Sequence, residues 1–135
     1  MNTTHPYICG FVCCLSAVLL LAIPGCSKTE KSKDLPVART PKEAATQLEQ
    51  AFASAPIEEV KQTAAVASKA ITTGEYEAAV MSLTAIKSKQ NLTLEQGMAV
   101  HNSMVLLESR LIAAMQAGDQ NAKRAYELLK RTKRQ

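Results

Sequence analysis

The sequence IEEVKQTAAVASKAITTGEYEAAVMSLTAIKSK, residues 57–89, predicts the basic unit of this fold. Before the glycine, apolar residues recur three or four positions apart, as they do on one face of a helix, at Ile57, Val60, Ala64, Ala67 and Ile71. The same spacing resumes after it, at Tyr76, Ala79, Val80, Leu83 and Ile86. Glycine often ends a helix because it accepts a positive φ. We therefore expect two antiparallel helices joined at Gly74.

The segments on either side also predict helices. A first helix begins at Thr40-Pro41, where a hydroxyl can cap the helix and proline suits its first turn, and runs to about residue 53. Thr93 and Gln96 match a capping box that opens a long fourth helix, whose predicted apolar stripe is Val100, Met104, Leu107, Leu111 and Ala114. A last helix follows over residues 119–131, with an apolar side made of Ala122, Ala125, Tyr126 and Leu129. No stretch predicts a strand, so the expected fold class is all-α.

An internal repeat relates the second and third helices to the fourth and fifth. Gly74 and Gly118 are 44 residues apart, each is followed by an acid, and the same offset pairs Ala70 with Ala114. A fixed offset of 20 to 50 residues is typical of helical repeat proteins. We therefore expect two hairpins of the same kind.

The segment Gly74-Glu75-Tyr76-Glu77-Ala78-Ala79-Val80 resembles the turn and second-helix start of a tetratricopeptide (TPR) repeat. Gly74, Tyr76 and Ala79 match that pattern, whereas its first-helix Trp, Leu-Gly and Tyr fall at Thr63, Val66-Ala67 and Ala70. The resemblance implies a scaffold of helical hairpins that binds another protein, with Tyr76 and Leu83 as candidate contact residues. A small antiparallel helix bundle with glycine turns is the alternative.

An apolar run of 16 residues, 8–23, precedes the helical region. It is shorter than the roughly 20 residues of a membrane-spanning helix and close to the core of a signal peptide, about 7–15 residues. The residues that end it, Ile23-Pro24-Gly25-Cys26, resemble the lipobox of bacterial lipoproteins. That resemblance implies acylation of the Cys26 sulfur and removal of residues 1–25. No Lys or Arg precedes the run, so an uncleaved anchor with the following chain in the cytoplasm is the alternative.

These features predict three parts of the chain. Residues 1–25 form a signal peptide, residues 26–40 an acylated cysteine and flexible tether, and residues 41–135 a helical domain with a basic C-terminal helix. The expected location is the bacterial cell envelope, lipid-anchored and facing the periplasm. The domain is rich in alanine and has three aromatic residues, Phe52, Tyr76 and Tyr126. Such a domain buries little apolar area, which favours self-association or a protein partner.

Catalytic chemistry is not expected. After the apolar run the chain has one histidine, His101, without a partner three or four residues away, so we predict a surface or partly buried histidine and no metal site. No nucleophile and base stand in an orienting motif, and no glycine-rich phosphate loop occurs. We expect neither an enzyme nor a cofactor.

Positive charge is concentrated at the C-terminus. Residues 119–135 carry a balance of +4, whereas residues 41–118 carry −2. The expected contacts to an anionic surface are Lys123, Arg124, Lys130, Arg131 and Arg134. The predicted function is a lipid-anchored scaffold for protein–protein interaction. The alternative is a module that binds the membrane or an envelope polymer through this helix, and nucleic acid is excluded if the chain is exported.

Overall fold

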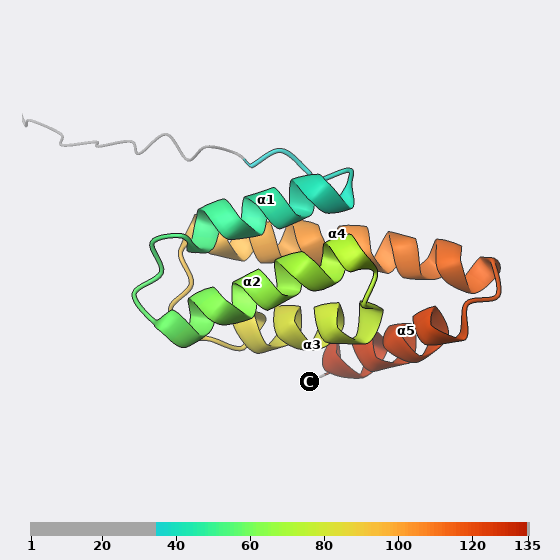
Figure 1. The fold of residues 1–135 in the computed structure, drawn as a ribbon. Helices are drawn as coiled ribbons and strands as arrows, with labels where there is room; N and C mark the ends of the chain where they lie inside the picture. The colour runs from blue at the N-terminus through green and yellow to red at the C-terminus, as the bar shows by residue number, and fades with distance from the viewer. Residues whose placement is uncertain (1–34, 135) are drawn as a thin grey trace, which may run out of the picture. The chain divides into compact units, whose positions relative to one another are not determined.

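The computed structural model describes residues 35–134. The predicted leader, Cys26 and most of the expected tether lie outside these residues. Within them the chain forms five helices and no strand, which confirms the all-α class (Figure 1). The helices are α1 (Pro41–Phe52), α2 (Glu58–Thr73), α3 (Tyr76–Lys87), α4 (Leu94–Gln116) and α5 (Gln120–Thr132).

Side chains at the N-termini of α1, α4 and α5 satisfy backbone donors that have no partner inside the helix. The Thr40 hydroxyl accepts a hydrogen bond from the backbone N–H of Glu43, and Pro41 occupies the first turn of α1. At the start of α4, Thr93 and Gln96 form both bonds of the predicted capping box. The carboxylate of Asp119 caps α5. The predicted starts of α1 and α4 are therefore confirmed.

The turns at Gly74 and Gly118 have the same geometry. Both glycines adopt positive φ, 77° and 89°. The N–H of Glu75 bonds to the carbonyl of Ala70 at 3.0 Å, and the N–H of Asp119 bonds to the carbonyl of Ala114 at 3.0 Å. Each bond closes a Schellman-type turn at the end of a helix. The 44-residue offset therefore relates equivalent hydrogen bonds in two hairpins, α2–α3 and α4–α5.

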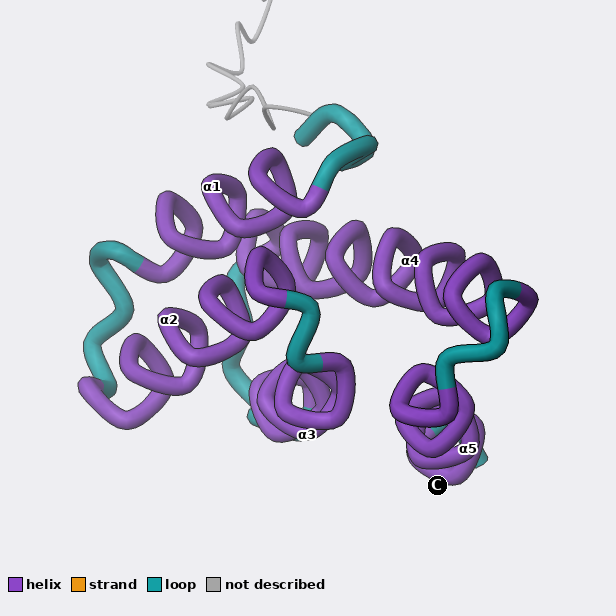
Figure 2. The backbone as a smooth tube through the Cα atoms, turned by 45° about the vertical axis from the view of Figure 1, so that its right-hand side comes forward, coloured by secondary structure: helices purple, strands orange, loops and turns teal. Residues whose placement is uncertain are grey.

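The hairpins are joined through α1 as well as through direct contacts. Helix α1 packs against α2 and α4, while α3 packs against α2, α4 and α5. Helix α5 contacts only α3 and α4 among the principal helix pairs. Figure 2 shows α3 and α5 end-on with α4 running across them, so the long α4 connects α1 with α5.

Large aliphatic side chains and alanines together form the core. The largest fully buried apolar side chains are Phe52, Leu48, Leu83, Ile86, Leu111, Leu129 and Val80. Alanines at helix contacts, such as Ala67 in α2 and Ala79 in α3, are completely buried. The predicted stripes are correct except at their edges: Ile57 is exposed, and Tyr76, Met104, Ala114 and Tyr126 are half-buried.

The predicted flexible tether over residues 26–40 is wrong for its last part. Residues 35–40 lie against α1 and α4, and Ala38 is buried in the core. The carbonyl of Pro36 accepts a hydrogen bond from Gln47 Nε2 at 2.6 Å and one from Asn102 Nδ2 at 3.4 Å. Gln47 and Asn102 are both buried and also bond to each other, Asn102 Nδ2 donating to Gln47 Oε1 at 3.4 Å, so the Pro36 carbonyl completes a buried network of amides. In the sequence, Leu35 and Val37 are the only large aliphatic residues of this segment, which disfavours an ordered arm; the amides that hold it belong to α1 and α4.

Candidate interaction surface on α4 and α5

Helix α4 is apolar on two sides. Its inner side packs into the core through Ala99, Val100, Leu106, Leu107 and Leu111. On the opposite side Leu94, Val105 and Ile112 remain 67%, 47% and 40% exposed. We call the row formed by Leu94, Met98, His101, Val105 and Ile112 the α4 outer stripe. A row of large exposed aliphatics on one helix is a candidate binding surface.

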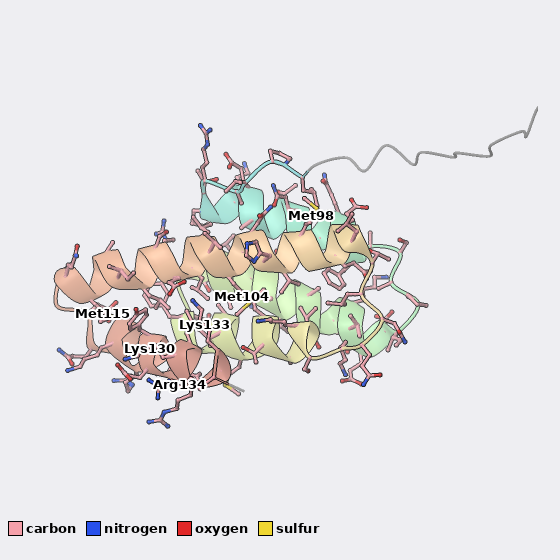
Figure 3. The ribbon with its side chains drawn as sticks, turned by 180° about the vertical axis from the view of Figure 1, so that it is seen from behind. Met98, Met104, Met115, Lys130, Lys133 and Arg134 are labelled. Carbon is pink, nitrogen blue, oxygen red and sulfur yellow. The ribbon has the colours of Figure 1, made fainter. Side chains whose placement is uncertain are left out.

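The α5 side of this stripe carries two methionines and several cations. Met104 and Met115 are half-buried and pack against the core. Figure 3 shows both on the edge of α4 nearest α5, with Lys133 beside Met104 and with Lys130 and Arg134 on α5. Methionine is flexible and polarisable, and it is common on surfaces that adapt to a partner.

One ion pair joins the two helices at this edge. The Lys133 ammonium lies 2.6 Å from a carboxylate oxygen of Glu108, and both side chains are partly exposed. Lys133 was not among the predicted contact residues. Its position on the α4 side follows from the packing of α5, which the charge pattern alone does not contain.

The five predicted cations of the C-terminal helix do not form one group. Arg124 lies on the α3 side, where its Nε donates to Glu77 at 3.0 Å. Lys130 pairs with Glu127 at 3.0 Å, and its ammonium lies 5.6 Å from the centre of the Tyr126 ring. Lys123, Arg131 and Arg134 are exposed, and within residues 35–134 none of them has an acid within 4.0 Å.

Electrostatics on α5 also affect one acid. The hydrogen bond from Lys130, and then the charge of that ammonium, lower the pKa of the Glu127 carboxyl below its ordinary value of 4.5. Arg131 and Arg134 add smaller effects in the same direction, and desolvation opposes them. The Glu127 carboxylate therefore offsets part of the positive charge of α5.

The two predicted partner contacts on α3 have different environments. Tyr76 is half-buried and packs against the core. Leu83 is completely buried. The prediction that Leu83 contacts a partner is therefore wrong for the folded domain, because its side chain has no accessible surface. Its helical spacing placed it on the same face as the core residues Ala79, Val80 and Ile86.

The sequence reasoning missed Leu94, Met98, Val105 and Ile112. These residues are spaced four and seven positions apart, with His101 between Met98 and Val105, and this spacing could have indicated a second apolar face on the helix. The inner stripe of the same helix obscured it, since both stripes have helical periodicity and only packing decides which is buried.

Two features are absent from residues 35–134. No three His, Cys, Asp or Glu side chains of this part are grouped so that they could hold a metal ion, and His101 is exposed. No helix in the same part combines the length and apolar character needed to span a membrane.

The chain was compared with protein-family models, curated proteins and solved structures. No family model matches it, and neither does any curated protein or solved structure.

Proposed function

We propose that this chain is a lipid-anchored protein of the bacterial cell envelope whose helical domain faces the periplasm and binds another protein through the α4 outer stripe. The domain acts as a scaffold without catalysis. The observation that carries the proposal is the exposure of Leu94, Val105 and Ile112 along one helix. Covering such surface gains about 25 cal/mol per Å² of apolar area removed from water.

The hairpin architecture supports the proposed scaffold function. Gly74 and Gly118 end their helices with the same backbone geometry and the same hydrogen bond five residues back. TPR repeats are also helical hairpins. Because residues 74–80 resemble the turn of such a repeat, we propose that the two hairpins are TPR-like. The repeat offset of 44 residues and Gln120 in place of the second tyrosine are departures from the TPR pattern.

The proposed anchor rests on the sequence Ile23-Pro24-Gly25-Cys26 at the end of the apolar run. If the tether ends where the chain docks, it comprises residues 26–34 and reaches at most about 30 Å at 3.3–3.6 Å per residue. We expect the mature protein to partition into detergent with the mass of residues 26–135 plus lipid. Cys26→Ser should block processing, and an unmodified full-length chain with a cytoplasmic C-terminus would refute the anchor.

The scaffold function is tested by co-purification from envelope fractions. Val105→Glu places a charge in the α4 outer stripe, whereas Val66→Glu does the same on α2, where Val66 is 53% exposed. Both positions lie on exposed helix faces, so neither change should unfold the domain. A specific partner should be lost with Val105→Glu and retained with Val66→Glu. Equal recovery with both variants would show that the stripe is not the binding surface.

A second candidate function is contact of α5 with an anionic membrane or envelope polymer. Lys123 and Arg131 help line a shallow depression on α5 and have no acid within 4.0 Å in the described domain. Each cation near an anionic surface contributes about 1 kcal/mol. Lys123→Glu and Arg131→Glu test this without removing α5, whose Leu129 is buried in the core. Salt-sensitive binding to anionic vesicles should fall in both variants, and binding insensitive to salt would refute the contact.

A further inference from the structure

The α4 outer stripe has the spacing of a helix–helix seam. Leu94, Met98, His101 and Val105 are separated by four, three and four residues, and Ile112 follows seven residues later. Alternating steps of three and four are the a and d positions of a coiled coil, where side chains insert between those of a second helix. Between Val105 and Ile112 the seam position is occupied by Glu108, whose carboxylate forms an ion pair with Lys133. The stripe is therefore shaped for one more helix lying along α4.

The charges beside the C-terminal half of the seam sum to a net positive charge. From Met104 to the end of α4 the only acid is Glu108. Lys130, Lys133 and Arg134 lie on the α5 side of this half of the helix (Figure 3). Glu108 and Glu127 each pair with one lysine, so Arg134 leaves a net positive flank.

From these two features we propose that the occupant of the α4 outer stripe is an amphipathic helix of a partner protein, with acidic side chains on the flank that meets Lys130 and Arg134. This inference rests on the proposed scaffold function and names the partner's chemistry. A second copy of this chain fits less well, because its own α4 stripe brings the same cations. A membrane surface does not require the three-and-four spacing, and the Glu108 carboxylate within the seam disfavours an anionic one.

Two designed helical peptides test the chemistry with the full-length chain in detergent. They share one leucine seam and differ only in a flank of three Glu or three Lys residues. Fluorescence anisotropy should give at least about tenfold tighter binding of the acidic peptide, decreasing with salt. Arg134→Glu should remove most of this preference, Val105→Glu should abolish binding, and Val66→Glu should change neither. Equal affinity for the two peptides, or equal effects of Val105→Glu and Val66→Glu, would overturn the proposal.

Crosslinking in cells separates this inference from the proposed function. A photo-crosslinking amino acid replaces Val105 in the full chain, with the matched position Val66 as control. Attachment at Val105 alone to an acid-flanked amphipathic helix of another protein supports both proposals. Attachment to a partner segment of other chemistry keeps the scaffold function and overturns the acidic-helix inference. A homodimer, a lipid adduct or no product overturns both.

Discussion

Lys133 and Glu108 connect the end of α5 to the middle of α4 through an ion pair of 2.6 Å. Their side chains retain 45% and 32% of their accessible surface, so water and salt screen the attraction. The pair orients two neighbouring helices at the edge of the α4 outer stripe more than it stabilises the fold.

A double-mutant cycle with Glu108→Gln and Lys133→Met should therefore give a coupling free energy of at most about 1 kcal/mol. Urea denaturation of the two single variants and the double variant measures it. The coupling should diminish in high salt. A salt-independent coupling well above this range would mean that the pair is effectively buried in solution.

Replacing the three glycines of the described domain with alanine should lower the free energy of unfolding at two positions and raise it at the third. Gly74→Ala and Gly118→Ala place a side chain at φ of 77° and 89°, which costs about 1–2 kcal/mol. Gly97 lies inside α4 and should gain about 0.5–1 kcal/mol from the same change. An added Cβ meets nothing within 4 Å at any of these sites, so backbone preference alone sets the sign. Thermal unfolding would measure this, with about 4–8 °C per kcal/mol in a domain of this size.

Leu83→Ala should destabilise the domain by about 2–5 kcal/mol, because it leaves a cavity in the core. Met81 lies two residues earlier on α3 and is 63% exposed, so Met81→Ala should change the free energy of unfolding by less than about 0.5 kcal/mol. If the Leu83→Ala chain does not fold, Leu83→Met gives a milder test at less than about 1.5 kcal/mol. Similar losses at positions 81 and 83 would contradict the placement of Leu83.

Gln47→Ala should release the docked segment before α1. The substitution removes the 2.6 Å bond to the Pro36 carbonyl and leaves Asn102 without the Gln47 oxygen as acceptor. A cost of about 1–3 kcal/mol is expected for the buried groups left unpaired. Trypsin should then cleave after Arg39 faster than in the parent chain. Gln50→Ala, at an exposed position of the same helix, is the control and should leave the cleavage rate unchanged.

Glu127 should titrate below its ordinary pKa of 4.5 because Lys130 hydrogen-bonds to its ionised form. A depressed pKa means that the contribution to stability is present above the unfolded value and is lost as the pH falls through the folded value. Carboxyl NMR shifts against pH measure the pKa directly. Lys130→Met keeps the aliphatic stem and should move the pKa of Glu127 back up. If the pKa of Glu127 is unchanged in the Lys130→Met variant, a group other than Lys130 causes the shift.

Local sequence was sufficient for the helices and their ends. Thr93 and Gln96 determine the start of α4, and Gly74 and Gly118 determine where α2 and α4 stop, because caps and positive φ depend on residues that are neighbours in the chain. The 44-residue offset between the two glycines likewise predicted two similar hairpins. The proposed lipid anchor at Cys26 also rests on local sequence, in a part of the chain that the structure does not describe.

Tertiary packing decided which apolar residues remained accessible. Leu83 and Val105 have comparable helical surroundings in the sequence, yet Leu83 is buried and Val105 is exposed. Packing also brought Lys133 to Glu108 across 25 residues and Pro36 to Asn102 across 66 residues. Periodicity identifies an apolar helix face, but whether another helix covers it depends on the arrangement of the whole domain. The core stripes were therefore predictable, whereas the exposed stripe of α4 and its basic flank required the structure.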